Sequence, residues 1–308
     1  MDGSSAGIGY AEYLTDADLR LLAAAGTGQA HQIPAASGGS TEGAGGASAV
    51  AARLRRDPEA LQALLADPRV FEAIFGAEAV AAGEAVVVSP FLAFAVAVHR
   101  AVADLASVDY VPERSAARQR VPVFDAPELR DFLAAPARRL FLAELLASFT
   151  RVASGRYRVS AGGRQRTRRF SELDPVRLAG LLDAVPDESR PGIYRRLGDV
   201  ALFLTGVFPD YVASRAFGPV SAARLLRAAQ VPAREQERFA ATGDIELLEH
   251  LGTRWYRCAL ALAPVRTAHL AVVGEVAERF RQARRVLNHV ADRYLLGPDS
   301  PWFAHPAH

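Results

Sequence analysis

Signals for the starts of helices recur along this chain and limit its fold more than any other pattern. Three Asp-Pro pairs, beginning at Asp57, Asp67 and Asp174, each combine an aspartate that can cap a helix with a proline at the first helical position. Asp125 opens a further segment of the same kind, FDAPELRDFL. Because the apolar residues between these starts follow helical spacing, the sequence predicts an all-α, multi-helix, bundle-like domain over residues 49–297.

A single segment departs from this helical spacing. In GRYRVSAGGRQRTRRF, about residues 155–170, residue types alternate on both sides of a glycine pair, which is typical of a β-hairpin. The candidate anion- or nucleic-acid-binding residues of this basic hairpin are Arg156, Arg158, Arg164, Arg166, Arg168 and Arg169. The predicted fold is therefore all-α with one inserted basic β-hairpin.

The two ends of the chain are predicted to lie outside this domain. Residues 1–25 predict a short N-terminal helix capped by Thr15 or Asp16, and residues 26–48 are rich enough in Gly, Ser and Ala to predict a flexible linker. On such a tether the helix would dock on its own domain or on a partner, and we favour docking on its own domain. Residues 298–308 predict an irregular C-terminal tail.

The composition narrows the class of protein. With 308 residues, 50% of them hydrophobic, the chain can bury a substantial core. Its positive charges are all arginine, which indicates a GC-rich bacterial genome, and the net charge of +2 does not by itself imply nucleic acid or an anionic membrane. The single cysteine, Cys258, excludes an internal disulfide and favours a reducing compartment. Because no secretion-signal pattern and no membrane-spanning apolar run occur, we expect a cytoplasmic protein without a membrane partner.

The segment RRLGDVALFLTGVFPDY combines a glycine and a carboxylate with a strongly apolar helix. Gly198 and Gly206 lie on a face of small residues, which lets another helix approach closely. A buried carboxylate needs a partner, and Arg195 and Arg196 precede Asp199 at helical spacing. We therefore interpret Arg195, Arg196 and Asp199 as a structural ion pair, which we favour, or as a ligand-binding site.

This segment and two later ones give three sequence patterns in the second half of the chain. They are LGDVALFLTGVFPD, GTRWYRCAL and ARRVLNHVADRYL. Together they resemble a family of actinobacterial-type proteins of unknown function, in which a Gly-Asp, an apolar stretch and a Phe-Pro-Asp/Glu precede a glycine-tyrosine helix. Either Trp255 or Tyr256 matches the tyrosine of that family. The resemblance implies a shared helical fold and brings no activity with it.

The two predicted helices before the hairpin give the element order of a winged helix-turn-helix, whose wing contacts phosphate or the minor groove. The second of these helices contains LFLAELLASF, which is mostly apolar, whereas a recognition helix needs exposed polar side chains. Another basic stretch, PERSAARQR at residues 112–120, is predicted to lie in a loop. Nucleic acid is therefore an alternative partner and not the favoured one, because positive charge alone does not imply phosphate binding.

Familiar catalytic patterns do not occur in the sequence, which has neither a GxxxxGK loop nor an HExxH pair. We expect no metal site and no cofactor, and we identify no catalytic residue. The leading interpretation is a non-enzymatic cytoplasmic interaction or regulatory protein that binds a protein partner or self-associates. The alternatives are a nucleic-acid-binding protein that uses the basic hairpin, and a helical enzyme or small-molecule binder with a buried site near Arg195 and Asp199.

Overall fold

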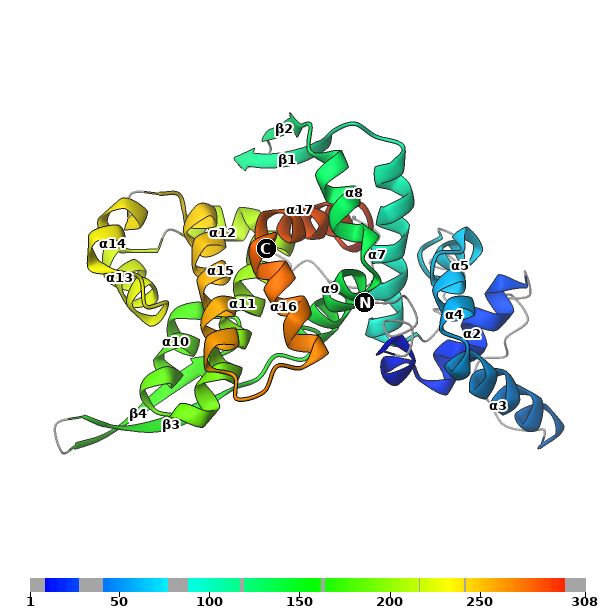
Figure 1. The fold of residues 1–308 in the computed structure, drawn as a ribbon, viewed down its shortest axis with the longest axis horizontal. Helices are drawn as coiled ribbons and strands as arrows, with labels where there is room; N and C mark the ends of the chain where they lie inside the picture. The colour runs from blue at the N-terminus through cyan, green and yellow to red at the C-terminus, as the bar shows by residue number, and fades with distance from the viewer. Residues whose placement is uncertain are drawn as a thin grey trace, which may run out of the picture. The chain divides into compact units, whose positions relative to one another are not determined.

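The computed structural model describes residues 9–27, 41–76, 88–116, 119–161, 164–215, 217–240 and 242–296 (Figure 1). Helices dominate these ranges, and the strands form two antiparallel hairpins, so the predicted all-α fold with an inserted hairpin is confirmed. The chain forms two compact units. Unit 1 comprises residues 1–109, 125–147 and 290–308, and unit 2 comprises residues 110–124 and 148–289.

This division differs from the single helical domain that the sequence predicted over residues 49–297. Two of the points where the chain passes between the units fall inside helices, α9 (Pro136–Ser148) and α17 (Phe280–Val290). Domain boundaries are usually recognised by Pro-, Gly- or polar-rich linkers, and a boundary inside a helix has none. The predicted tail, residues 298–308, lies outside the described residues.

Unit 1 is helical throughout its described part. Besides a helical segment at residues 9–13 and most of α9, its elements are α2 (Asp16–Gly26), α3 (Thr41–Arg56), α4 (Pro58–Leu65), α5 (Pro68–Phe75), α7 (Pro90–Ala106), α8 (Ala126–Ala134) and the π-helical turn η4 (Ala291–Leu295). One hydrophobic cluster connects the N-terminal segment with helices α2, α3, α4, α5, α7 and α9.

The N-terminal segment is part of the core of unit 1. Tyr10, Leu19 and Leu22 are fully buried in it, which confirms docking of this helix on its own chain. Thr15 caps α2 through a capping box with Asp18, in which each side chain accepts a hydrogen bond from the other residue's backbone N–H. These contacts fix the start of α2 and the apolar face that it buries.

The predicted linker over residues 26–48 is partly helical. Gly26 is the last residue of α2, and α3 begins at Thr41, while residues 28–40 lie outside the described residues. The later part of α3 buries Ala51 and Leu54. A helix anchored at one end by burial extends toward its other end at little cost, since propagation is easier than nucleation. The composition of residues 41–48 predicted a flexible linker, but these residues form the first part of α3.

Unit 2 combines two hairpins with a helical group. Besides most of α17, its elements are β1 (Val111–Ala116), β2 (Gln119–Val123), β3 (Ser154–Ala161), β4 (Arg164–Ser171), α10 (Pro175–Ala179), η2 (Gly180–Asp183), η3 (Asp187–Ser189), α11 (Arg190–Val207), α12 (Pro209–Arg215), α13 (Pro219–Ala228), α14 (Ala233–Ala240), α15 (Asp244–Leu262) and α16 (Ala268–Glu278). Helices α11 and α15 lie side by side and form its centre (Figure 1).

The predicted Asp-Pro helix starts are confirmed. Asp57 accepts a hydrogen bond from the backbone N–H of Ala60, and Asp67 and Asp174 cap α5 and α10 in the same way. Asp125 precedes α8 without a side-chain capping bond. The Asp-Pro pattern predicts a helix start reliably because the aspartate side chain accepts a hydrogen bond from a backbone N–H in the first turn of the helix that follows it. That contact joins residues close in the sequence.

The small residues of α11 bring its neighbours close, as the sequence predicted. A Cβ atom added at Gly198 would lie within 3.0 Å of ring carbons of Tyr256 on α15. One added at Gly206 would lie 2.7 Å from Cβ of Leu287 on α17. Gly252 on α15 gives similar room to the ring of Phe280. Glycine at these positions therefore sets the separation between the central helices.

Two elements of unit 2 depart from the sequence pattern. The apolar residues over 265–296 follow the spacing of one helix, but α16 ends at Glu278. The next residue, Arg279, has φ −118° and ψ 36°, and α17 begins at Phe280. The stretch PERSAARQR is expected in a loop, but its described residues, 112–116 and 119–120, lie in strands β1 and β2. Val111 of β1 is buried, and the side chain of Arg285 on α17 donates to the carbonyls of Val111 and Pro112. Because Arg285 is far from β1 in the sequence, the residues of the stretch themselves do not indicate that they form a strand.

Candidate functional site

The hairpin β3–β4 has two chemically different faces. Its register pairs Arg156 with Arg169, Arg158 with Thr167, and Tyr157 with Arg168. Because directly opposite residues share a face and neighbours along a strand alternate, the described side chains fall into two sets. Face A carries Ser154, Arg156, Arg158, Thr167, Arg169 and Ser171, and face B carries Gly155, Tyr157, Arg168 and Phe170.

Four arginines of the hairpin have described side chains, and these are exposed and have no acidic partner among the described residues. Arg156, Arg158, Arg168 and Arg169 are all exposed, and none forms an ion pair or hydrogen bond through its side chain within the part of the chain that the structure describes. In register, Arg164 and Arg166 lie opposite Ala161 and Val159, and their side chains lie outside that part. The six predicted residues thus belong to one ribbon but not to one face.

Face B attaches the hairpin to the rest of unit 2. The rings of Tyr157 and Phe170 lie 6.5 Å apart, and the hydroxyl of Tyr157 is 2.7 Å from where a Cβ of Gly180 would stand. At the base of the hairpin, Glu172 accepts a hydrogen bond from the backbone N–H of Ala153 at 3.0 Å. Since face B is used for packing, face A is the one left for a partner.

Arg196 pairs with the base of the hairpin and not with Asp199. Its guanidinium lies 3.0 Å from Glu172, donates to the hydroxyl of Ser148 at 2.8 Å, and stands 3.9 Å above the ring of Phe149. The interpretation that either arginine pairs with Asp199 is therefore resolved in favour of Arg195. Arg195 precedes Asp199 by four residues and so lies on the same side of α11, whereas Arg196 lies on another side and faces Glu172.

Asp199 is held by two donors. Arg195 Nε and the hydroxyl of Tyr256 both donate to its Oδ1, at 2.9 and 2.8 Å. Arg195 also lies 2.9 Å from Nε2 of His269. Complete burial raises the pKa of Tyr256 well above its usual value, and the adjacent Asp199 carboxylate raises it further. Burial, together with the charge of Arg195, lowers the pKa of His269. Arg195 and Asp199 therefore form an ion pair, and the buried hydroxyl of Tyr256 is a third member of the cluster.

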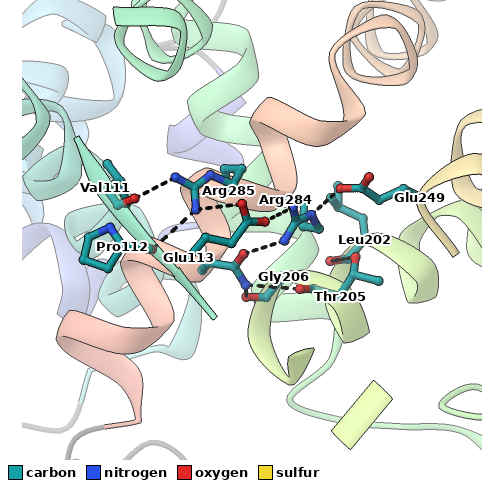
Figure 2. Close-up of polar contacts among 10 residues, drawn as sticks. Val111, Pro112, Glu113, Leu202, Thr205, Gly206, Glu249, Arg284 and Arg285 are labelled. Atoms are coloured by element: carbon teal, nitrogen blue, oxygen red, sulfur yellow. Dashed lines mark hydrogen bonds and ion pairs between the residues drawn. The ribbon is translucent and has the colours of Figure 1, made fainter. Parts of the chain in front are cut away.

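A second buried network joins α17 to β1 and α15. Figure 2 shows Glu113 between Arg284 and Arg285, and Arg284 also pairs with Glu249. Arg285 has no exposed side-chain surface, and it donates to the carbonyl of Val111 at 2.9 Å. Two arginines facing two carboxylates balance in charge, so the network holds the hairpin β1–β2 and offers no free cation. The sequence showed ARRVLNH as a pattern but gave no sign of these partners.

Asn288 completes the end of α11. In a helix the carbonyl of Thr205 would accept from the N–H four residues later, but that residue is Pro209, which has none. The side-chain amide of Asn288 donates to this carbonyl at 3.1 Å and to that of Gly206. Thr205 itself donates back to the carbonyl of Ala201 at 2.7 Å. The helix end is therefore buried without an unsatisfied carbonyl at Thr205.

A cavity of about 310 Å³ lies in unit 2 beyond the base of the hairpin. It is formed where the segment after β4 meets α10, the last turns of α11, α12 and the start of α13. Its lining consists of Leu173, Asp174, Pro175, Val176, Arg177, Leu204, Tyr211, Val212, Phe217, Gly218, Ser221 and Arg224. Sequence reasoning did not identify this cavity, because its walls come from five separate elements.

The described residues were also compared with the requirements of a metal site, a reactive cysteine and a membrane-spanning helix. Among the described residues, no group of three His, Cys, Asp or Glu side chains is arranged to hold a metal ion. Burial raises the pKa of Cys258, which disfavours the reactive thiolate. None of the helices described here is long and apolar enough to cross a bilayer.

The helices of the suggested winged helix-turn-helix do not belong with the hairpin. Helix α8 and nearly all of α9 are in unit 1, whereas β3 and β4 are in unit 2. In α9, Phe141, Leu142 and Leu145 are buried, so this face does not project base-reading side chains. Comparison with protein-family models, with curated proteins and with solved structures gives no match to this chain.

Proposed function

We propose that this chain is a non-enzymatic binding protein that holds the phosphate backbone of a nucleic acid on face A of the basic hairpin. One observation carries the proposal. Arg156 and Arg169 stand directly opposite each other on an exposed face, and neither has an acidic partner within the described residues.

A like-charged pair at this position is unfavourable for the isolated hairpin. Directly opposed charges of the same sign weaken a two-stranded ribbon by roughly 0.2–1 kcal/mol. Arg158 adds a third charge on the same face, about 7 Å along the strand from Arg156. In contrast, Arg177 and Arg196 in the same unit have carboxylate partners, Asp174 and Glu172. An anion bound on face A would remove the repulsion that the hairpin retains on its own.

The other residues of face A favour phosphate over an acidic protein. Ser154, Thr167 and Ser171 supply hydroxyls, and no apolar side chain is found among the described residues of this face. Protein interfaces usually depend on buried aromatic or apolar anchors, which this face lacks. Arginine forks and hydroxyls are the groups that most often contact phosphate oxygens. These features support a nucleic-acid partner over the protein partner that the sequence favoured.

Binding of this kind would recognise the backbone and not the base sequence, because face A presents charges and no recognition helix accompanies it. The expectation of a cytoplasmic protein belongs to the same proposal, as does the family resemblance of the second half of the chain. The expected cytoplasmic location fits such a partner, whereas the resemblance implies only a shared helical fold.

The test is the salt dependence of binding to a fluorescently labelled 20-nucleotide single strand and its duplex. The variant carries Arg156→Gln, Arg158→Gln and Arg169→Gln together. Loss of three phosphate contacts should reduce the slope of log K against log salt by about 2–3. Affinity should fall for every sequence tested by a similar factor.

The control variant carries Arg53→Gln, Arg238→Gln and Arg281→Gln, which removes the same charge from exposed positions outside the hairpin. Its slope should equal that of the unmodified chain. If the two triple variants lose affinity equally, net charge and not face A is responsible. If the unmodified chain binds neither nucleic acid at 50 mM salt, the proposed function is wrong.

A further inference from the structure

We infer that the nucleic acid held on face A is duplex DNA, with one strand of the hairpin facing each of its two backbones. This inference rests on the proposed function and names the partner of the same face. It follows from the placement of the cations, the width of the ribbon, and the absence of aromatic residues from the described part of face A.

The cations of face A are divided between the two strands of the hairpin. Arg156 and Arg158 lie on β3, about 7 Å apart along the strand, and Arg169 lies on β4 opposite Arg156. Adjacent strands are about 4.8 Å apart, which is close to the width of the minor groove of B-DNA, about 6 Å. Repulsion between Arg156 and Arg169 favours guanidinium positions that point away from each other. Each strand of the ribbon therefore matches one of the two backbones that border this groove.

The density of charge on face A also favours a duplex. Over about 7 Å of its axis a duplex carries about four phosphates, whereas one strand carries about two. Arg156, Arg158 and Arg169 lie within that length, and none has an acidic partner among the described residues. A single strand in this geometry would leave one guanidinium without a phosphate.

Face A has nothing on which the bases of a single strand could stack. Stacking on aromatic rings contributes much of the binding free energy when proteins hold single strands. The described residues of face A include no aromatic ring, and the next residues in register, Ser160 and Gln165, are not aromatic either. The rings of Tyr157 and Phe170 belong to face B, which packs on the rest of unit 2. The entropy lost on ordering a flexible strand would therefore not be offset on face A.

Two exposed rings elsewhere in unit 2 do not change this conclusion. Tyr110 and Phe124 lie 5.6 Å apart next to the hairpin β1–β2. Figure 1 shows the two hairpins well apart, with α11 and α15 between them. A base stacked on these rings would therefore not belong to a nucleotide whose phosphate is held on face A.

The experiment measures the affinity of the full chain for the labelled 20-nucleotide DNA strand, for its DNA duplex, and for an RNA duplex of the same sequence, at 50 mM salt. The DNA duplex should bind about tenfold more tightly than the single strand, as expected for one additional charge-assisted contact. The RNA duplex should bind more weakly than the DNA duplex, because its minor groove is wide and shallow.

A gain of function tests the stacking argument. Thr167→Tyr places a ring on face A opposite Arg158 and should raise the affinity for the single strand by about fivefold or more. The matched control Val220→Tyr adds a ring at an exposed position of α13 and should leave that affinity unchanged. Replacing both Tyr110 and Phe124 by serine should also leave it unchanged.

The inference is overturned if the single strand or the RNA duplex binds as tightly as the DNA duplex. It is also overturned if Thr167→Tyr and Val220→Tyr behave alike, or if the double serine variant loses affinity for the single strand. The proposed function fails by a different result, namely that neither the DNA strand nor its duplex binds.

Discussion

Replacing Gly198 by alanine tests whether the close approach of α11 and α15 is what the glycine provides. The added Cβ would lie within 3.0 Å of Cδ1, Cε1 and Cγ of Tyr256. The ring cannot turn aside easily, because it is fully buried and its hydroxyl donates to Asp199 at 2.8 Å. One of the two helices must therefore shift, or the ring must leave its rotamer.

The size of the effect follows from two opposing terms. Overpacking a rigid core costs about 1–3 kcal/mol, and so tight a contact belongs at the upper end of that range. Alanine is better than glycine in a helix by about 1 kcal/mol, which offsets part of the cost. We expect Gly198→Ala to lower the free energy of unfolding by about 2 kcal/mol, which corresponds to roughly 4–8 °C in Tm for a unit of this size.

Gly192→Ala is the control on the same helix, since a Cβ there meets nothing within 4 Å. It should stabilise the chain by up to about 1 kcal/mol through helix propensity alone. Denaturant titrations followed by circular dichroism at 222 nm measure both variants. In a Tyr256→Phe background the ring loses its hydrogen bond and can move, so Gly198→Ala should cost less there. Equal stability of the two alanine variants would refute the packing argument.

Three further outcomes are expected. Burial, and then the charge of Arg139, lower the pKa of His99 to about 3 in the folded chain, compared with about 6.5 in the unfolded chain. The neutral imidazole therefore contributes fully to the free energy of unfolding above pH 6.5, and this contribution is lost as the pH falls toward 3. Between pH 7 and pH 5 this group alone should remove about 2 kcal/mol, and His99→Gln should show that much less loss in denaturant titrations. Asn288→Ala should destabilise by about 1–3 kcal/mol, because two backbone carbonyls at the end of α11 lose a donor; equal stability in thermal melts would contradict this role. Arg169→Glu should raise Tm slightly by pairing with Arg156 while weakening nucleic-acid binding, and a change of both in the same direction would argue against face A.

The sequence was most informative where a contact is local. The caps at Asp57, Asp67 and Asp174 connect residues two or three positions apart, so the residue types alone predicted those helix starts. The hairpin β3–β4 was predicted for the same reason, since the alternating residues and the glycine pair lie in one continuous stretch of sequence. The pairing of Arg195 with Asp199 is one helical turn in length and was also anticipated.

The tertiary structure decided everything that depends on distant partners. Three contacts join residues far apart in the sequence: Tyr256 as the second donor to Asp199, Glu172 as the partner of Arg196, and Arg285 as the donor to Val111 of the hairpin β1–β2. No alternation or cap announces such contacts, because their geometry exists only after the helices have packed. The same holds for the hairpin as a surface: the sequence determined that it is basic, and only its register and packing determined that Arg156, Arg158 and Arg169 share the face left exposed.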